Sequence, residues 1–237
     1  MSPLTESTRL TLAKGQPVPN DPYLYTDTVL LLHGDGTNGS TNIVDSSKVA
    51  GSPKTVTAVG NAQISTAQSK FGGASIAFQT PSALTVLNSS QFNFGVDDFT
   101  IEAWCYRTST ATSFEIVSYG NPGADGFFFG STTSAISFGT GNGVVLASSS
   151  TSLALNVWTH IAVTRSSNVT RVFANGIAGA TTTNALNNLN STTVFRVGTN
   201  RAVNAFATGY IDEFRITKGV ARYTANFTPP TAPFPDI

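Results

Sequence analysis

The sequence predicts an all-β fold, a two-sheet antiparallel sandwich of the jelly-roll kind, from three observations. Residues 99–106 (FTIEAWCY) alternate side-chain character with a period of two, as a strand in a sheet does. Short apolar segments recur about every ten residues, separated by Gly, Ser and Thr, as in sandwiches and jelly rolls. No segment shows a long helical periodicity.

Residues 99–106 are expected to form a central strand. One face carries alternate residues from Phe99 to Cys105, and the other carries Thr100 to Tyr106. Because both faces hold bulky groups, we expect the strand to be covered on each side. Cys105 is then a small buried hydrophobe rather than a nucleophile. The two histidines are interpreted as core or strand residues rather than metal ligands.

The remaining strands and flanking segments follow from the same signals. Asn175-Gly176 is the dipeptide of a type I′ turn and predicts a hairpin. Residues 1–26 are expected to be an extended arm interrupted by prolines, residues 27–217 the sandwich, and residues 218–237 a proline-rich tail packed on it. The other strands are predicted at 28–33, 55–59, 75–78, 83–87, 114–119, 127–130, 135–138, 144–147, 158–165, 171–174, 177–180, 194–197 and 210–217.

Composition and charge exclude several classes of function. Charged residues make up only 11% of the 237 residues, and 13 basic side chains balance 13 acidic ones. Without a basic run, nucleic acid is not an expected partner. No apolar run approaches the roughly 18–20 residues that span a bilayer, so no membrane insertion is expected. The N-terminus lacks the basic-then-apolar pattern of a secretory signal, so synthesis in the host cytoplasm is expected.

A family resemblance rests on an ordered set of short motifs. They are VLLLHGDG with VDSS, FGGASIAF, DDFTIEAW, WTHIAVTR, FANG, FRVG and GYIDEFRI, and together they cover residues 28–217. In order and spacing they resemble the laminin G-like, concanavalin A-like jelly roll. The arrangement, with the closing KGVARYTANFTPPTAPFP, is also similar to copies in phage virion proteins. The resemblance implies two antiparallel sheets and functions from glycan binding to adhesion and particle assembly, and it does not by itself imply catalysis.

The acidic residues do not form a recognisable catalytic cluster. Glycoside hydrolysis needs two carboxyl groups roughly 5–10 Å apart, and Glu102 has no acidic neighbour at i±2 or i±4. A pair with Glu213 on another strand is an alternative, but an ion pair of Glu102 with Arg165 or Arg215 is the favoured interpretation. No Gly-x-Ser-x-Gly elbow precedes a helix. We therefore expect no catalytic residues and no enzyme activity.

Candidate binding residues lie in loops. Trp104 and Trp158 are interpreted as core packing rather than as a sugar platform. No cofactor is expected; Asp35 and Asp212 are candidates for a structural calcium, with turn formation as the alternative. Three loops expected to cluster supply the candidates for glycan or partner binding. These candidates are Tyr119, Asn121, Asp125, Asn142, Asn200 and Arg201.

These observations together predict a non-catalytic structural protein on the virion exterior, as capsid decoration or as part of a tail or fibre. Its expected partners are other virion proteins, copies of itself in a symmetric assembly such as a trimer, and surface glycans bound weakly. Two alternatives remain open: a carbohydrate-binding lectin or adhesin module, and a glycan-degrading enzyme.

Overall fold

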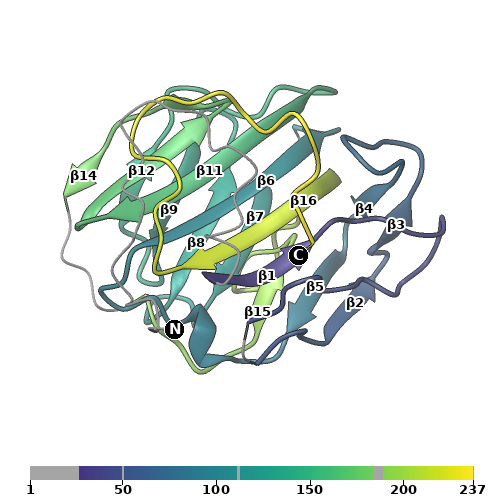
Figure 1. Cartoon of the computed structure of the whole chain (residues 1–237), viewed down its shortest axis with the longest axis horizontal. Coiled ribbons are helices and arrows are strands. Elements are labelled where there is room, and N and C mark those ends of the chain that lie inside the picture. The colour runs from purple at the N-terminus through teal and green to yellow at the C-terminus, as the bar shows by residue number, and fades with distance from the viewer. Residues whose placement is uncertain (1–26, 50, 111–112, 184–188, 237) are drawn as a thin grey trace, which may run out of the picture.

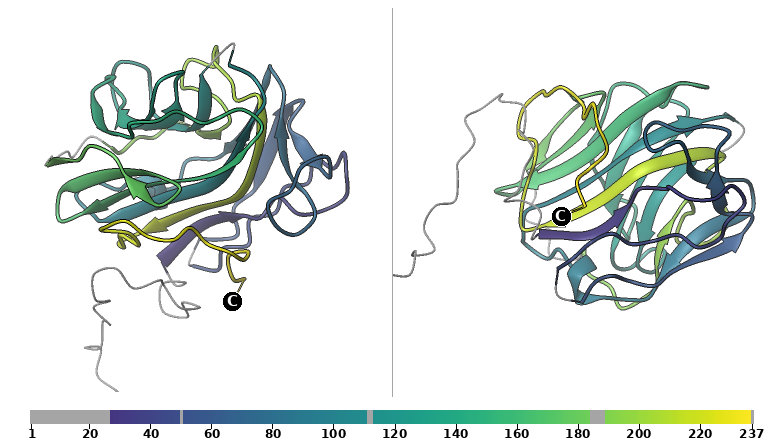
Figure 2. Two further views of the ribbon diagram at one scale, coloured as in Figure 1. Left: turned by 90° about the horizontal axis from the view of Figure 1, so that it is seen from above. Right: turned by 45° about the vertical axis from the view of Figure 1, so that its right-hand side comes forward.

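The computed structural model describes residues 27–49, 51–110, 113–183 and 189–236, and the predicted extended arm, residues 1–26, lies outside them. The fold is all-β, with two antiparallel sheets packed face to face, which confirms the predicted sandwich (Figure 1). Figure 2 shows the two layers edge-on in its left view. No helix among the described residues is long and apolar enough to cross a membrane.

The first sheet, sheet A, contains nine strands in the path β13-β12-β11-β6-β16-β4-β3, with β1 added beside β16 and β14 beside β12. Its centre is β6 (Phe99–Arg107), paired on one side with β11 (Trp158–Ser166) and on the other with β16 (Gly209–Lys218). The other strands are β1 (Thr28–Leu32), β3 (Gln63–Ser65), β4 (Ser75–Phe78), β12 (Val169–Ala174), β13 (Ile177–Ala178) and β14 (Thr182–Thr183).

The second sheet, sheet B, contains seven strands in the order β10-β9-β8-β7-β15-β5-β2. A short 3-10 turn, η2 (Ser90–Phe92), follows β5 and places Phe92 in the core. The strands are β2 (Val56–Gly60), β5 (Ser82–Val86), β7 (Phe114–Tyr119), β8 (Phe127–Ser131), β9 (Ile136–Thr140), β10 (Val145–Ser148) and β15 (Phe195–Val197).

Aromatic side chains fill the space between the sheets. Phe99 of β6 stacks on Phe94 at 4.4 Å between ring centroids, and Phe94 stacks on Phe127 of sheet B at 5.1 Å. Cys105 points into the same core and is fully buried, which raises the pKa of its thiol far above the ordinary range. The interpretation of Cys105 as an inert apolar residue is therefore confirmed.

The hairpin predicted at Asn175-Gly176 is present between β12 and β13. Both residues have positive φ angles, +47° and +77°, which a type I′ turn requires and which Asn and Gly adopt most readily. Adjacent to this turn, the backbone N–H of Phe227 donates to the carbonyl of Gly176 at 3.0 Å. The hairpin thus also holds part of the C-terminal segment.

That C-terminal segment, residues 219–236, is called the strap. It has no regular secondary structure and crosses the outer face of sheet A, as the yellow trace in Figure 2 shows. Its backbone bonds mostly to side chains of the sheet: Thr100 Oγ1 donates to the Val220 carbonyl at 2.9 Å, and Thr164 Oγ1 donates to the Tyr223 carbonyl at 2.8 Å. Prolines remove several donors, which is why the strap lies across the strands instead of joining the ladder.

Candidate functional site

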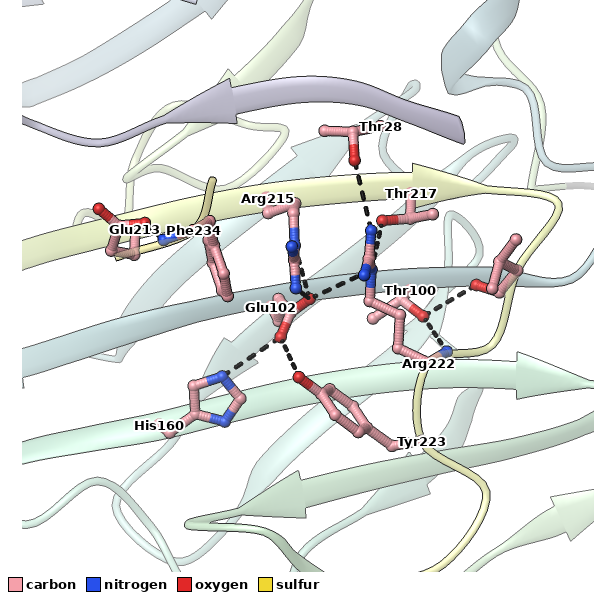
Figure 3. Close-up of polar contacts among 11 residues, drawn as sticks. Thr28, Thr100, Glu102, His160, Glu213, Arg215, Thr217, Arg222, Tyr223 and Phe234 are labelled. Carbon is pink, nitrogen blue, oxygen red and sulfur yellow. Dashed lines mark hydrogen bonds and ion pairs between the residues drawn. The ribbon is translucent and has the colours of Figure 1, made fainter. Parts of the chain in front are cut away.

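The outer face of sheet A is divided into a part that the strap covers and a part that it leaves open. The covered part is built around Glu102, which is fully buried (Figure 3). Its Oε1 accepts two hydrogen bonds from Arg215, at 2.9 and 2.7 Å, and its Oε2 accepts one from the hydroxyl of Tyr223 in the strap at 2.8 Å. His160 Nε2 lies 3.4 Å from Oε2, and Arg222 Nε lies 3.7 Å from Oε1.

These partners keep Glu102 charged. Burial alone would raise the pKa of its carboxyl, but the charge of Arg215, followed by His160 and Arg222, lowers it well below the usual range. The predicted ion pair with Arg215 is confirmed; Arg165 instead donates to the Gly95 carbonyl and to Asn168. A carboxylate held in this way is unsuited to act as a proton donor.

Glu213 belongs to a second cluster, which fastens the far end of the strap. His33 lies between Glu213 and Asp236, with 2.7 Å from Nδ1 to Glu213 Oε1 and 2.7 Å from Nε2 to Asp236 Oδ1. Burial lowers the pKa of His33, but the two carboxylates outweigh it and raise the pKa to about 9. Glu213 Oε2 also accepts the backbone N–H of Phe234, whose ring lies 3.5 Å from the Arg215 guanidinium carbon. The postulated pair of Glu102 and Glu213 therefore does not form in this structure, because each carboxylate has other partners.

The open part of sheet A carries a row of three aromatic residues, called the aromatic row. Trp158 of β11 lies opposite Tyr106 of β6, which lies opposite Tyr210 of β16. The ring centroids are 5.4 Å apart for Tyr106 and Trp158, at an interplanar angle of 56°, and 5.9 Å apart for Tyr106 and Tyr210, at 74°. All three are half-buried. Within the described chain, their two hydroxyls and the indole N–H make no hydrogen bond to protein.

The expected core packing agrees with the burial of Trp104 but is wrong for Trp158. Both belong to the outer face of sheet A rather than to the interior between the sheets, and Trp158 is only half-buried. Trp104 is buried at 6% exposure because residues 70–71 cover it: Lys70 Nζ lies 3.8 Å from its ring centroid, and Phe71 meets it edge to face at 6.1 Å. Trp158 has no such cover and remains available.

The outer face of sheet B carries a groove of about 400 Å³. It is lined by three threonines, by the apolar residues Val86, Leu87 and Val194, and by Arg196. Arg196 on β15 lies opposite Ser118 on the neighbouring strand β7, and Ser118 in turn lies opposite Phe128 on β8. The Phe128 ring lies across Gly139, where a Cβ atom would come within 2.5 Å of it. Any larger residue at position 139 would displace this ring.

Two of the three candidate loops are packed together, as expected. The Gly123 N–H donates to the Gly141 carbonyl at 3.0 Å, which joins residues 120–126 to the turn that carries Asn142. Asn121 and Asp125 bond to each other at 2.8 and 3.2 Å, and Asn200 is engaged within its own loop with Asn204. Arg201 is close enough to Asp125 for their charges to interact. Among these candidates, Arg201 is the one whose side chain makes no hydrogen bond to the described residues.

Tyr119 is not in an exposed loop, contrary to expectation. It is the last residue of β7, and its side chain is fully buried. Its hydroxyl donates to Asn88 at 2.5 Å and contacts Asn93 at 3.0 Å and the carbonyl of Ser191. The ring therefore stabilises the core and cannot receive a ligand.

The calcium candidates Asp35 and Asp212 lie near each other. Asp212 is fully buried; its Oδ2 accepts the N–H groups of Lys70 and Phe71 at 2.7 and 3.1 Å, whereas its Oδ1 has no partner among the described residues. Burial raises the pKa of Asp212 to about 7, and the neighbouring carboxylates of Glu213 and Asp35 add to the effect. No group of three or more His, Cys, Asp or Glu side chains in the described part of the chain is arranged to hold a metal.

The comparison with protein families identifies the fold family. Residues 72–222 match the model described as the concanavalin A-like lectin/glucanases superfamily, which is more than half of the chain. The chain therefore belongs to this superfamily, and its jelly roll is of the lectin-like kind. A comparison with curated proteins finds no match.

Solved structures with the same fold include domain 4 of AbnA, an extracellular GH43 arabinanase from Geobacillus stearothermophilus, in complex with arabinotriose. It is 16% identical, with a TM-score of 0.62 and coverage of 81% of this chain and 93% of that one. The binding domain of botulinum neurotoxin DC, solved in complexes with SialylT and with rat synaptotagmin II, is also similar. Both are 16% identical, with TM-scores of 0.58, and each match covers 82% of this chain and 48% of the toxin chain.

Sequence reasoning missed two members of the aromatic row, Tyr106 and Tyr210, and two residues on the outer face of sheet B, Arg196 and Phe128. Each lies on a predicted strand, so alternation alone assigns it a face. What brings them together is the order and register of strands that are distant in sequence, which local patterns do not specify.

The Glu102 network predicts a difference between two tyrosines. Replacing Tyr223 by Phe removes one donor from a buried carboxylate, and we expect a loss of roughly 1–3 kcal/mol in the free energy of unfolding. Replacing Tyr210 by Phe removes a hydroxyl without a protein partner, and we expect a change within about 0.5 kcal/mol. Urea denaturation of both variants measures this, and equal losses would contradict the assigned network.

Proposed function

We propose that this protein is a non-catalytic glycan-binding protein that works on the exterior of a phage particle. The aromatic row of Tyr106, Trp158 and Tyr210 is the observation that carries the glycan-binding part. Buried Tyr and Trp usually find a hydrogen-bond partner, so half-buried rings with unpartnered polar tips suit a ligand with both apolar and hydroxyl groups. A sugar ring has this combination.

The shape and charge of the row favour an uncharged sugar chain. The angles of 56° and 74° make the surface stepped, so it offers separate ring faces rather than one flat floor. The row itself carries no charged side chain, and the hydroxyl-bearing Thr80, Thr108 and Thr208 bond to one another or to the backbone at the same end of sheet A. Apolar rings with a few polar groups are the usual composition of a small-ligand site.

The solved neighbours support a glycan as the class of ligand. Domain 4 of the arabinanase is described in complex with arabinotriose, and a toxin binding domain with SialylT. Enzymatic hydrolysis is the less favoured candidate, because Glu102 and Glu213 are each bound by other groups and lie in separate clusters. Incubation with polysaccharide should release no reducing ends, and activity lost in Glu102→Gln would contradict this part of the proposal.

The aromatic row predicts which substitutions weaken binding. On a glycan array that includes arabino-oligosaccharides, Trp158→Ala and Tyr210→Ala should each weaken binding roughly three- to tenfold, since an aromatic contact is worth about 0.5–1.5 kcal/mol. Val96→Ala, at an exposed apolar position away from the row, is the matched control and should bind as the wild type does. If both row variants bind as the wild type does and keep its melting temperature, the aromatic row is excluded as the glycan-binding site.

A location on the virion exterior is supported by the resemblance of the closing segment to phage proteins. That segment is the strap, and its aromatic residues fasten it to sheet A through Tyr223, Phe227 and Phe234. Contacts with other virion proteins and a symmetric assembly such as a trimer belong to the same proposal. Antibodies to the folded protein should label the surface of intact particles in electron micrographs, and labelling confined to disrupted particles would contradict an exterior location.

A structural calcium at Asp35 and Asp212 is the one cofactor that we propose. The unpartnered Oδ1 of Asp212, buried beside a second carboxylate, fits a hard cation that takes oxygen ligands. Calcium at millimolar concentration should raise the melting temperature of the wild type and leave that of Asp212→Asn unchanged. Asp97→Asn, at an exposed position, should respond as the wild type does. A wild type that is indifferent to calcium would exclude the ion.

A further inference from the structure

The outer face of sheet B holds two arginines that form no salt bridge with any carboxylate of the described residues. Arg196 Nη1 donates to the Val194 carbonyl at 3.1 Å, and no ion pair involves Arg196 within the described residues. Arg201 lies over the Phe128 ring, with 5.4 Å from its guanidinium carbon to the ring centroid. Its Nε and Nη1 atoms have no acceptor in the described part of the chain. Those two Arg201 atoms are enclosed by the protein, so Nη2 is the atom of Arg201 that an outside acceptor can reach. Arg196 is half-buried, and its Nε and Nη2 make no hydrogen bond to the described residues, so they are available to an acceptor from outside.

The strand register places these two groups on one surface. Arg196 on β15 is opposite Ser118 on β7, which is opposite Phe128 on β8. Arg196 and Phe128 are therefore two strand spacings apart, about 10 Å between their backbones. Because Arg201 is held over Phe128, both guanidinium groups lie within reach of one or two linked sugar units.

Two nearby carboxylates, those of Glu115 and Asp125, compete only weakly with an outside ligand for these arginines. Glu115 lies against Gly130, its Oε1 accepts the hydroxyl of Ser113 at 2.7 Å, and burial raises the pKa of its carboxyl. Asp125 is engaged by Asn121. Both act on Arg201 only at a distance. These two carboxylates balance the two arginines in formal charge, so the attraction for an acidic ligand comes from the placement of the guanidinium groups and not from a net positive charge.

We propose that the outer face of sheet B binds the carboxylate group of an acidic glycan through Arg196 and Arg201. The Nε and Nη2 atoms of Arg196 can pair with a carboxylate in two parallel hydrogen bonds, which a lysine does not reproduce, and Nη2 of Arg201 can donate a single one. The adjoining groove of about 400 Å³, with the hydroxyls of Thr57 and Thr85 on its wall, receives the sugar that carries the acid. This site lies on the opposite sheet from the aromatic row, so it is separate from the site of the proposed function.

Matched ligands test the charge requirement. In calorimetry, the wild-type protein should bind sialyllactose at least tenfold more tightly than lactose. It should also bind polygalacturonate at least tenfold more tightly than fully methyl-esterified polygalacturonate. The preference should weaken as salt is raised, because exposed charges are screened. Equal affinity within each pair would overturn the proposal, as would equally tight binding of dextran sulfate and duplex DNA, which would indicate attraction to any polyanion.

Matched variants test the residues. Arg196→Gln and Arg201→Gln should each weaken binding of polygalacturonate roughly tenfold, and Arg196→Lys should restore only part of it. Arg171→Gln is the control, because Arg171 makes the same kind of bond to the backbone two residues earlier but belongs to sheet A. Trp158→Ala should retain acidic-glycan binding, so a failure at one sheet is distinguishable from a failure at the other. A loss in Arg171→Gln or Trp158→Ala as large as in Arg196→Gln would overturn the assignment.

Discussion

The buried charge of Glu102 is the constraint on which the outer face of sheet A depends. A carboxylate without access to water is unfavourable unless charged and hydrogen-bonding partners surround it. Arg215 supplies part of that compensation from the sheet, and Tyr223 supplies another part from the strap. The strap must therefore lie where Tyr223 reaches Glu102, and that position leaves the aromatic row uncovered. The covered and open regions of this face have one common cause.

The two sheets present chemically different outer surfaces on one scaffold. Sheet A offers aromatic rings without charge at its open end, whereas sheet B offers guanidinium groups that form no salt bridge with the described residues, beside a groove of mixed apolar and threonine lining. Both surfaces are supported from behind by the same aromatic core, in which Phe94, Phe99 and Phe127 stack. A rigid core of this kind holds side chains of either face in place without a change in backbone shape. Interactions at one face need not disturb the other.

Local sequence patterns were sufficient for most strands and for the sandwich, because alternation and turn residues act over a few residues. The strands at 99–106, 158–165 and 210–217 were predicted to within a residue at each end. The short strands β3 and β14 were missed, since two or three residues carry too little periodicity. An ion pair of Glu102 with an arginine, either Arg165 or Arg215, followed from the cost of burying a charge, and the structure shows that the partner is Arg215. Tyr119 was misplaced because the adjoining Gly120 suggested a loop, while burial of its hydroxyl among Asn88, Asn93 and Ser191 depends on segments far away in the chain.

The clamp of His33 between Glu213 and Asp236 has a mechanical consequence. It ties the end of the strap to His33, which directly follows β1, and to Glu213 within β16. Tension applied through residue 236 would therefore act first on this clamp, then on Phe234, and only afterwards on the contact of Phe227 with the hairpin and on the Tyr223 hydroxyl. The strap would peel away one anchor at a time while the ladders of the sheet stay paired. Under force, the contacts of the strap are therefore expected to break one after another before the strands of the sandwich separate.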